Sequence, residues 1–211
     1  MGAHARRTLG RGRSETPQWT WYVSRTTRDV SNDVRAPILR SARLRLEPMN
    51  RAHVAPLLAY RLGNRTHLAP WKPTPRPDAF SETAVATEIE RSVAAASNGQ
   101  NVRFVVFEDE GEEIVGEGVW QSAILGYSID VVRQGRGYAT EGAARVIAYA
   151  FDELNLHRLQ TSYQPTNERS GRVLRKLGFV VEGYARDYLF LNDAWRDGIL
   201  VSLTNPHWRP D

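Results

Sequence analysis

The stretch that most constrains the fold of this chain runs from Leu125 to Ala144. It begins with an alternation, in which Leu125, Tyr127 and Ile129 share one side, and this is typical of a β-strand. Beyond Arg133-Gln-Gly-Arg-Gly137, apolar residues recur at the spacing of a helix with one buried face. These residues are Ala143, Ile147, Ala150, Phe151 and Leu154. The stretch therefore predicts a strand, a glycine-containing loop and a helix, in that order.

A strand, a glycine loop and a helix start are together suited to binding phosphate. Gly135 and Gly137 let the backbone approach a ligand closely, and the first N–H groups of a helix have no partner within it. Two close glycines also occur in turns that bind nothing, so the loop alone leaves both interpretations open. It is not a P-loop, because no Gly-Lys-Ser/Thr follows. It also lacks the usual dinucleotide fingerprint, because Thr140 replaces the third glycine.

The loop resembles the acetyl-CoA pyrophosphate loop of the GNAT N-acetyltransferases, whose pattern is Gln/Arg-x-x-Gly-x-Gly/Ala. Gly135 and Gly137 match this pattern, whereas Val132 departs from it at the Gln/Arg position. Further motifs follow in the order Asn167-Glu-Arg-Ser170, Leu177-Gly-Phe179, Glu182-Gly-Tyr184, Arg186-Asp-Tyr188 and Trp195-Arg-Asp197. Over residues 38–208 the set resembles the RimJ/RimL-type ribosomal-protein-alanine N-acetyltransferases, RimJ more than RimL.

The rest of the chain predicts strands interleaved with helices. Strands are expected over residues 38–47, 101–107, 113–120, 157–163, 181–191 and 195–203. Helices are expected after a cap at Asn50, from Ser81 to Ala96, and from Asn167 to Gly178. The first of them carries an apolar stripe of Val54, Leu57, Leu58 and Leu62. This order predicts an α/β fold, a mixed central sheet with helices on both faces, which the resemblance also implies.

Residues 64–77 contain four prolines between positions 70 and 77. Such a segment is incompatible with a helix or a central strand, so an extended path that exposes Trp71 is expected. In RimJ-like chains an Asn-Arg…Leu-x-Pro-Trp segment stands here. The resemblance therefore makes Asn64, Arg65 and Trp71 candidates for acceptor binding, and Tyr188 is added to this substrate-binding set.

Charge and composition narrow the possible partners. The net charge is +4, and residues 1–36 hold seven arginines against three acids, so the whole surplus lies there. A nucleic-acid partner would therefore depend on this segment alone. The chain has no cysteine, which excludes disulfides and thiolate chemistry. Its five histidines lack ligand spacing, so no metal is expected.

The first 36 residues have no periodic apolar face and no apolar segment like that of a secretory signal. We expect residues 1–36 to form a disordered basic tail and residues 37–208 to form a GNAT acetyltransferase domain. No apolar run approaches the ~18 residues that cross a membrane. A cytoplasmic protein without a membrane partner, monomeric or homodimeric, is therefore the expectation.

The resemblance implies acetyl-CoA as the cofactor. Backbone N–H groups between Arg133 and Thr140 would anchor its pyrophosphate, with Arg133 or Arg136 as counter-charges. In this fold the strands next to the loop splay, leaving an amide near Ile129–Val132 for the thioester oxygen. The expected cofactor-binding residues are Ile129, Val132, Arg133, Gln134, Gly135, Arg136, Gly137, Tyr138, Ala139, Thr140, Asn167 and Ser170.

Asn167 and Ser170 face the same side of the first turn of a helix. From the residues alone, Asn167 is an ordinary helix cap. The resemblance implies instead that Asn167 contacts the cofactor arm and that Ser170 lies near its sulfur. Ser170 would then be the catalytic donor to the departing thiolate.

The base that accepts the proton of the acceptor amine stays open. RimL-like enzymes carry a Glu at the position of Leu189, so that role is not transferred. Asp187 and Glu117 are the candidate catalytic acids, with Tyr188 or a water chain as alternatives. A purely structural interpretation has Asp187 paired with Arg186 and Glu117 facing solvent.

The predicted function is acetyl-CoA-dependent acetylation of the N-terminal α-amine, expected on alanine, of a protein such as a ribosomal protein. One alternative is acetylation of a small amine, an antibiotic or a polyamine. The basic and aromatic residues of segment 61–77 argue mildly against a polycation. The other alternative is a non-catalytic acyl-CoA-binding module, which would need Gly135 and Gly137 but not Ser170.

Overall fold

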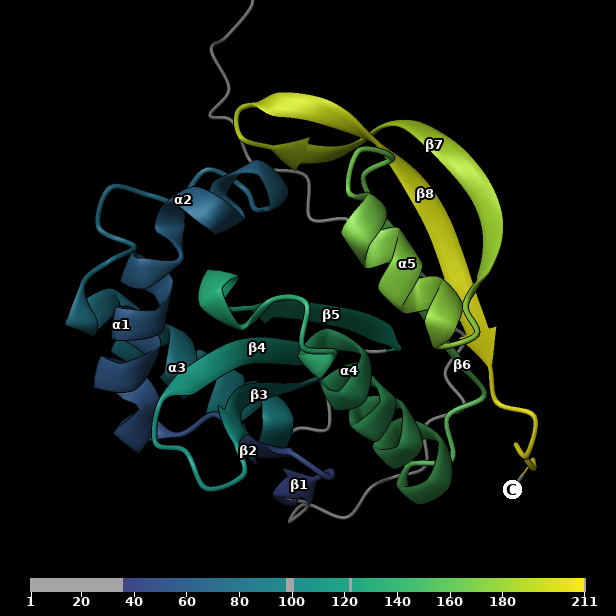
Figure 1. Cartoon of the computed structure of the whole chain (residues 1–211), viewed down its shortest axis with the longest axis horizontal. Helices are drawn as coiled ribbons and strands as arrows, with labels where there is room; N and C mark the ends of the chain where they lie inside the picture. The colour runs from purple at the N-terminus through teal and green to yellow at the C-terminus, as the bar shows by residue number, and fades with distance from the viewer. Residues whose placement is uncertain (1–35, 98–100, 122, 211) are drawn as a thin grey trace, which may run out of the picture.

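The computed structural model describes residues 36–97, 101–121 and 123–210. The predicted tail up to residue 35 and the predicted helix end at Asn98-Gly99 lie outside them. The described residues form an eight-stranded sheet in the order β1-β2-β3-β4-β5-β6-β8-β7 (Figure 1). Neighbouring strands are antiparallel except β5 and β6, which are parallel. The predicted mixed sheet is confirmed.

The elements have the following bounds. The strands are β1 (Leu39–Arg40), β2 (Leu44–Pro48), β3 (Asn101–Glu108), β4 (Ile114–Gln121), β5 (Ile124–Ile129), β6 (Arg158–Tyr163), β7 (Val180–Leu191) and β8 (Ala194–Thr204). The α-helices are α1 (Val54–Gly63), α2 (Arg65–Leu68), α3 (Glu82–Ser97), α4 (Tyr138–Ala148) and α5 (Glu168–Lys176). Short helical turns are η1 (Arg51–His53), η2 (Ala69–Trp71), η3 (Val131–Arg133) and η4 (Tyr149–Glu153).

Helices cover both faces of the sheet, as the sequence predicted. One apolar core lies beneath α1 and α3 and includes Leu57, Tyr60 and Ile89. The other lies beneath α4 and α5 and includes Val146 and Leu174 (Figure 1). Among the described residues, no helix combines the length and the apolar character that crossing a bilayer requires.

The predicted helix starts are confirmed at the level of side-chain caps. The Asn50 side chain accepts a hydrogen bond from the Ala52 N–H at 2.9 Å and opens η1, which continues into α1. Ser81 Oγ accepts from the Ala84 N–H at 3.2 Å, and Asn167 Oδ1 accepts from the Ser170 N–H at 3.1 Å. Each bond satisfies a helix-end N–H that has no partner within the helix.

Two predictions near the N-terminal end of the described chain are wrong. The single strand expected over 38–47 is a hairpin of β1 and β2, closed by a Ser41 N–H to Leu44 C=O bond of 2.9 Å. The turn contains neither Gly nor Pro, so the alternation runs through it without a signal. In α1, Leu62 of the expected stripe is 50% exposed, and Tyr60 is buried instead.

The prediction that segment 64–77 contains no helix is also wrong. It begins with α2 and η2, and the extended path begins only at Lys72. Pro70 stands in the first turn of η2, where its missing N–H has no partner to lose. Trp71 is consequently half-buried rather than exposed.

The C-terminal hairpin of β7 and β8 carries a bulge. Ala185 pairs with Gly198 and Leu189 pairs with Arg196, so residues 186–188 oppose Asp197 alone. The Asp197 carboxylate accepts hydrogen bonds from the Asp187 N–H, at 3.0 Å, and from the Tyr184 hydroxyl. Asp187 adopts a left-handed conformation with φ of +46°. A bulge of this kind bends a strand, and the hairpin curves toward the side of α2 (Figure 1).

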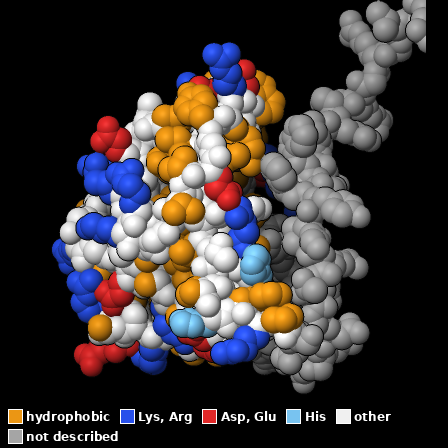
Figure 2. All heavy atoms as spheres, turned by 90° about the vertical axis from the view of Figure 1, so that its right-hand side faces the viewer, with side chains coloured by type: hydrophobic (Ala, Val, Ile, Leu, Met, Phe, Trp, Pro, Cys, Tyr) orange, Lys and Arg blue, Asp and Glu red, His pale blue; other side chains and the backbone are white. Residues whose placement is uncertain are grey.

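The hairpin of β7 and β8 exposes several large apolar side chains. Figure 2 shows hydrophobic side chains gathered on this side of the molecule, among charged and polar neighbours. The exposed large members on β7 and β8 are Val180, Val181, Tyr184, Phe190 and Trp195. Phe190 and Trp195 pack edge to face at the hairpin end, with ring centroids 5.4 Å apart.

Candidate active site

Strands β5 and β6 part almost as soon as they meet. The recorded pairing between them is Ile124 opposite Gln160. On its other edge β5 pairs with β4 along its length, and the Asp130 N–H donates to Val115 C=O at 2.9 Å. Backbone groups alternate between the two edges of a strand, so the N–H groups of Tyr127 and Ile129 point to the edge that β6 has left. We call this the open edge of β5. The amides expected near Ile129 lie on this edge, and their contact with a thioester oxygen stays a prediction.

The loop after β5 presents backbone donors. Gly135 and Gly137 have φ of +77° and +85°, a region that glycine enters without strain. Gly137 is the N-cap of α4 and offers no side-chain cap. The first N–H groups of α4, at Tyr138 to Thr140, therefore lack an intrahelical partner at the positive end of the helix. These groups fit an anionic diphosphate.

The side chains of the loop are partly engaged elsewhere. Arg133 lies 3.2 Å from Glu113, and Arg136 lies 3.8 Å from Glu108. Tyr138 is buried and its hydroxyl donates to Glu108 at 2.7 Å, so only its N–H is available to a ligand. Val132 is 68% exposed. The acidic turn before β4 thus already balances the arginines, whose role as counter-charges stays a prediction.

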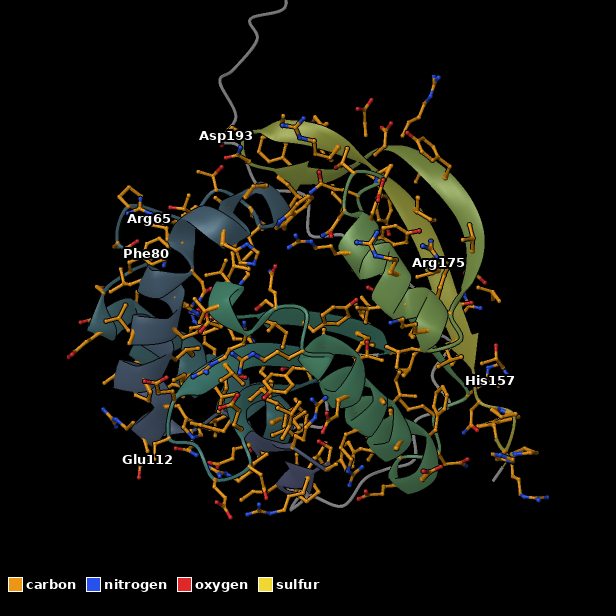
Figure 3. All side chains as sticks on the ribbon, viewed as in Figure 1. Arg65, Phe80, Glu112, His157, Arg175 and Asp193 are labelled. Atoms are coloured by element: carbon orange, nitrogen blue, oxygen red, sulfur yellow. The ribbon has the colours of Figure 1, made fainter. Side chains whose placement is uncertain are left out.

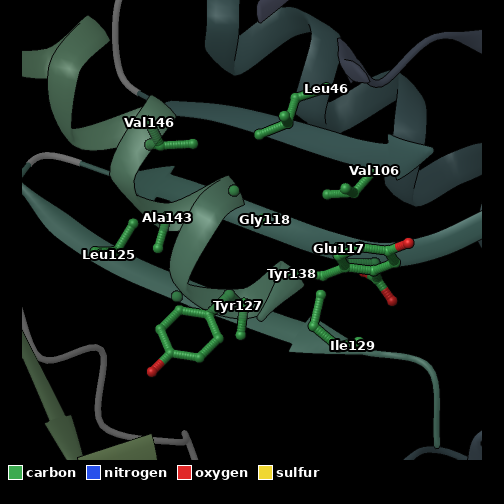
Figure 4. A pocket seen from close by; sticks show the side chains of 13 residues that line it. Leu46, Val106, Glu117, Gly118, Leu125, Tyr127, Ile129, Tyr138, Ala143 and Val146 are labelled. Atoms are coloured by element: carbon green, nitrogen blue, oxygen red, sulfur yellow. The ribbon is translucent and has the colours of Figure 1, made fainter. Parts of the chain in front are cut away.

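A pocket lies between α4 and strands β4 and β5 (Figure 4). Small residues make room for it on both sides, Gly118 and Gly126 from the strands and Gly142 from the helix. Tyr127 and Ile129 border it, so the pocket adjoins the open edge of β5.

Ser170 lies at the start of α5, opposite the open edge. Its Oγ is 3.1 Å from the Tyr127 hydroxyl. Burial raises the pKa of Tyr127 to about 12, although the hydrogen bond with Ser170 acts in the opposite direction. Tyr127 therefore stays protonated at neutral pH and can donate to Ser170, leaving the Ser170 O–H free for another acceptor. The sequence placed Tyr127 on a strand face but gave no sign that α5 would cover it.

The start of α5 is closely packed against β6. A Cβ at Gly171 would come within 2.8 Å of the Tyr163 ring. Asn167 acts as the ordinary cap described above, and a contact with the cofactor arm stays a prediction. Because Gly171 packs directly against the Tyr163 ring, the distance between α5 and β6 is fixed, and with it the position of Ser170 relative to the open edge.

Of the residues predicted to bind the acceptor, Asn64 is a buried support. It is 3% exposed, its Oδ1 accepts from the Val131 N–H at 2.8 Å, and its Nδ2 donates to Tyr60 C=O at 2.9 Å. Arg65 lies on the outer surface, 4.9 Å above the Phe80 ring (Figure 3). These two positions disfavour direct contact with a substrate at the open edge.

Three hydrogen bonds connect residues 64–70 with the loops that follow β5 and β6. One is the Asn64–Val131 bond. The second joins Gln134 Nε2 and His67 Nε2 at 2.6 Å, and Gln134 also accepts from the Arg169 side chain. In the third, Gln164 Nε2 donates to Pro70 C=O at 3.0 Å. Helices α1 and α2 and the turn η2 are thus hydrogen-bonded to the loops after β5 and β6, which the sequence did not reveal.

Glu117 is buried, so the structural alternative in which it faces solvent does not hold. It is 4% exposed and lies 3.0 Å from Arg61, 3.5 Å from Lys72 and 3.6 Å from Arg103. Burial alone would raise the pKa of Glu117, but the charge of Lys72 and the hydrogen bonds from Arg61 lower it below its usual value. Taking up a proton would break these ion pairs, which disfavours Glu117 as the base.

The same network of ion pairs makes the stability of the fold depend on pH. Glu88 lies between Arg61, at 2.7 Å, and Arg103. Burial raises its pKa, but hydrogen bonds and charges of both arginines lower it to about 2 in the fold, against 4.5 ordinarily. A depressed carboxyl pKa stabilises the fold above about pH 4.5, and the contribution is lost as the pH falls toward 2.

We therefore expect the free energy of unfolding, measured in urea, to fall by on the order of 1 kcal/mol between pH 5 and pH 3 because of Glu88. This figure allows for solvent screening of the partly exposed carboxylate. Glu88→Gln should flatten that dependence. Glu90→Gln is the matched control, because Glu90 is on the same helix, is exposed and approaches only to 3.8 Å of Arg51. Equal slopes in wild type and Glu88→Gln would contradict the assignment.

Asp187 and Tyr188 lie in the bulge of β7. The Asp187 side chain is exposed. The Asp197 carboxylate accepts a hydrogen bond from the Asp187 backbone N–H, a bond that does not involve the Asp187 side chain. The Tyr188 ring lies over Gly198, where a Cβ would approach it to 2.9 Å. Both residues are on the β7–β8 hairpin, and their roles as base and acceptor contact stay predictions.

The comparisons agree with this geometry. The sequence model of the family described as "Acetyltransferase (GNAT) domain" matches residues 43–180. The chain is 33% identical over 162 residues to the [ribosomal protein uS5]-alanine N-acetyltransferase of Escherichia coli (strain K12), covering 73% of this chain and 84% of that protein. Among solved structures, ribosomal-protein-S5-alanine acetyltransferase from Vibrio fischeri is similar with a TM-score of 0.79 and 30% identity, covering 83% of this chain and 100% of that one. Mycobacterium smegmatis RimJ in complex with CoA-disulfide has a TM-score of 0.73 and 29% identity, covering 80% and 85%.

Proposed function

The chain belongs to the GNAT acetyltransferase family, and from that premise we propose that it acetylates the N-terminal α-amine of a protein. The family membership makes it an N-acetyltransferase that uses acetyl-CoA. The observation that carries the proposal is the open edge of β5, a strand that is followed along the chain by the backbone anion site at α4 and that carries Tyr127, the partner of Ser170.

Acetyl-CoA supplies an activated acetyl group: a C–N bond forms, the C–S bond breaks, the nitrogen releases one proton and the thiolate takes up one. The N–H groups of Tyr138 to Thr140 hold the diphosphate. The Ile129 N–H, on the open edge, donates to the carbonyl oxygen where negative charge develops. Ser170 donates to the leaving sulfur, and Tyr127 orients the Ser170 hydroxyl through their 3.1 Å contact.

The proton of the amine needs little assistance. A free α-amine has a pKa near 8, so a useful fraction is neutral at pH 7 to 8. The ion pairs of Glu117 favour water as the proton acceptor over that carboxylate. Asp187 stays a candidate, because its side chain is exposed and can reach solvent.

We take the acceptor to be a ribosomal protein with an N-terminal alanine. The Escherichia coli and Vibrio fischeri relatives are named for alanine acetylation of protein S5, and they cover most of this chain. Segment 61–77 contains no carboxylate, the group that a polyamine site would need, and this supports an α-amine rather than a polyamine as the acceptor.

The proposal is tested by incubating the protein with acetyl-CoA and a panel of acceptors while thiol release is followed. Peptides that begin with alanine should be acetylated, and the same peptides with a blocked α-amine and a free lysine should not. Turnover only with polyamines or aminoglycosides would move the assignment to a small-molecule acetyltransferase. Tight acetyl-CoA binding without turnover of any amine would support a binding module.

A further inference from the structure

A second hydroxyl pair lies on the opposite face of β5. Ser128 stands between Tyr127 and Ile129, and its side chain points toward α1, where its Oγ is 3.0 Å from the Tyr60 hydroxyl. Adjacent strand residues face opposite sides, so Tyr127 and Ser128 place hydroxyls on the two faces of the sheet. Tyr60 is 5% exposed, whereas Ser128 is only half-buried. Tyr60 is thus held in the protein interior, whereas Ser128 is partly accessible to solvent.

The pair has unused hydrogen-bonding capacity. Burial raises the pKa of Tyr60 above its ordinary value, so the phenol stays neutral and can donate to Ser128. A serine hydroxyl has one donor and two acceptor positions, which leaves Ser128 one lone pair and its own O–H. Glu117, opposite Ser128 in the register, is already occupied by Arg61, Lys72 and Arg103. The spare capacity of Ser128 is therefore not consumed by the nearest charged neighbour.

The two faces of the open edge have different occupants. The α4 loop and Ser170 of α5 lie on one face, the face assigned to the cofactor. The face of Ser128 is covered by α1, and the adjoining α2 region is tied to the cofactor loop. An amine that attacks a carbonyl held at the Ile129 N–H has to come from the side that the cofactor does not fill. Ser128 places a half-buried hydroxyl on that side, beside the buried hydroxyl of Tyr60.

We propose that Ser128 binds the acceptor, its Oγ accepting a hydrogen bond from one N–H of the neutral primary α-amine, with Tyr60 as a positioning residue. This inference rests on the proposed function. A primary amine has a second N–H, which loses its proton to water as the C–N bond forms. One such bond aims the nitrogen lone pair at the carbonyl carbon, which is how orientation accelerates a reaction.

The test compares acceptor kinetics in three variants, with an alanine-first peptide as the probe. Ser128→Ala should lower kcat/KM for the peptide about 10-fold, the effect of one lost orienting hydrogen bond. Acetyl-CoA affinity by calorimetry should stay at the wild-type value, and the Tm should fall only by about 2–4 °C, the cost of the lost hydrogen bond with Tyr60. Ser128→Thr, which keeps the hydroxyl, should restore most of the activity. Tyr60→Phe should lower peptide kcat/KM by about 3-fold, with the loss in KM for the peptide and none in cofactor affinity.

A second probe separates contact from fold. The same peptide with an N-methylated first residue has only one N–H on its amine. The preference of the wild type for the primary amine should shrink in Ser128→Ala, and an unchanged preference would overturn the proposal. Wild-type kcat/KM in Ser128→Ala overturns it as well. A wild type that is inactive on every α-amine overturns the proposed function itself, whereas an active wild type beside an unaffected Ser128→Ala overturns this inference alone.

Discussion

Replacing Gly137 by valine is expected to abolish measurable acetyl-CoA binding, with affinity lower by at least about 100-fold, in a chain that still folds. Gly137 has φ of +85°, which a β-branched residue reaches only with strain. A Cβ there would also stand 3.4 Å from Arg43 Nη2. The loop has to shift, and with it the N–H groups at the start of α4. Two charge-assisted hydrogen bonds lost at about 1.5–3 kcal/mol each account for the drop.

The fold should survive this substitution. Strain at one left-handed residue costs about 1–3 kcal/mol, less than the 5–15 kcal/mol by which domains are usually stable. Gly183→Val is the matched control, because Gly183 is in β7, away from the loop, and a Cβ there meets nothing within 4 Å. Calorimetry and thermal unfolding on both variants decide the matter. A folded Gly137→Val protein with wild-type affinity would remove the loop as the anchor.

The parts of the fold that the sequence predicted are those encoded locally. The caps at Asn50, Ser81 and Asn167 each bond an N–H two or three residues away, so the residue and its partner are visible in one short segment. Gly178 ends α5 with φ of +86°. The Asn192-Asp193 turn has both residues in the left-handed region that such hairpins need.

The parts that the sequence did not predict depend on contacts between distant segments. Tyr127 meets Ser170, and Tyr60 meets Ser128, across 43 and 68 positions of the chain. The hydrophobic periodicity of the sequence does not indicate contacts between such distant residues, because these contacts depend on the strand order and on where the helices pack. The ion pair between Arg61 and the buried Glu117 has the same origin, and the sequence therefore left a catalytic and a solvent-facing Glu117 as open alternatives.

Removing the Ser170 hydroxyl is expected to distinguish between two hypotheses, that the protein is an acetyltransferase or that it only binds acyl-CoA. If Ser170 donates to the leaving sulfur, the contact is stronger in the transition state than with bound cofactor. Ser170→Ala should then lower kcat on the order of 10²-fold and leave acetyl-CoA affinity unchanged. The loss should be toward the lower end of that range, because a thiolate is already a good leaving group.

The structure removes one competing explanation for such a loss. The cap of α5 is Asn167, which bonds the Ser170 backbone and not its side chain. Ser170→Ala therefore loses only the contact with Tyr127, worth about 1 kcal/mol of stability. Ser97→Ala is the matched control, since Ser97 is also in a helix and bonds only its own turn, to Val93 C=O at 3.0 Å. Its kcat should equal that of the wild type.

Tyr127→Phe then locates the effect within the pair. It keeps the Ser170 hydroxyl but removes the donor that orients it, so a smaller loss in kcat, about 10-fold, is expected with unchanged cofactor affinity. If Tyr127 itself protonated the sulfur, Tyr127→Phe would instead lose more activity than Ser170→Ala. Full turnover in Ser170→Ala would withdraw the serine from the catalytic residues. The anion site of α4 and the open edge of β5 would then be the features on which binding and transfer depend.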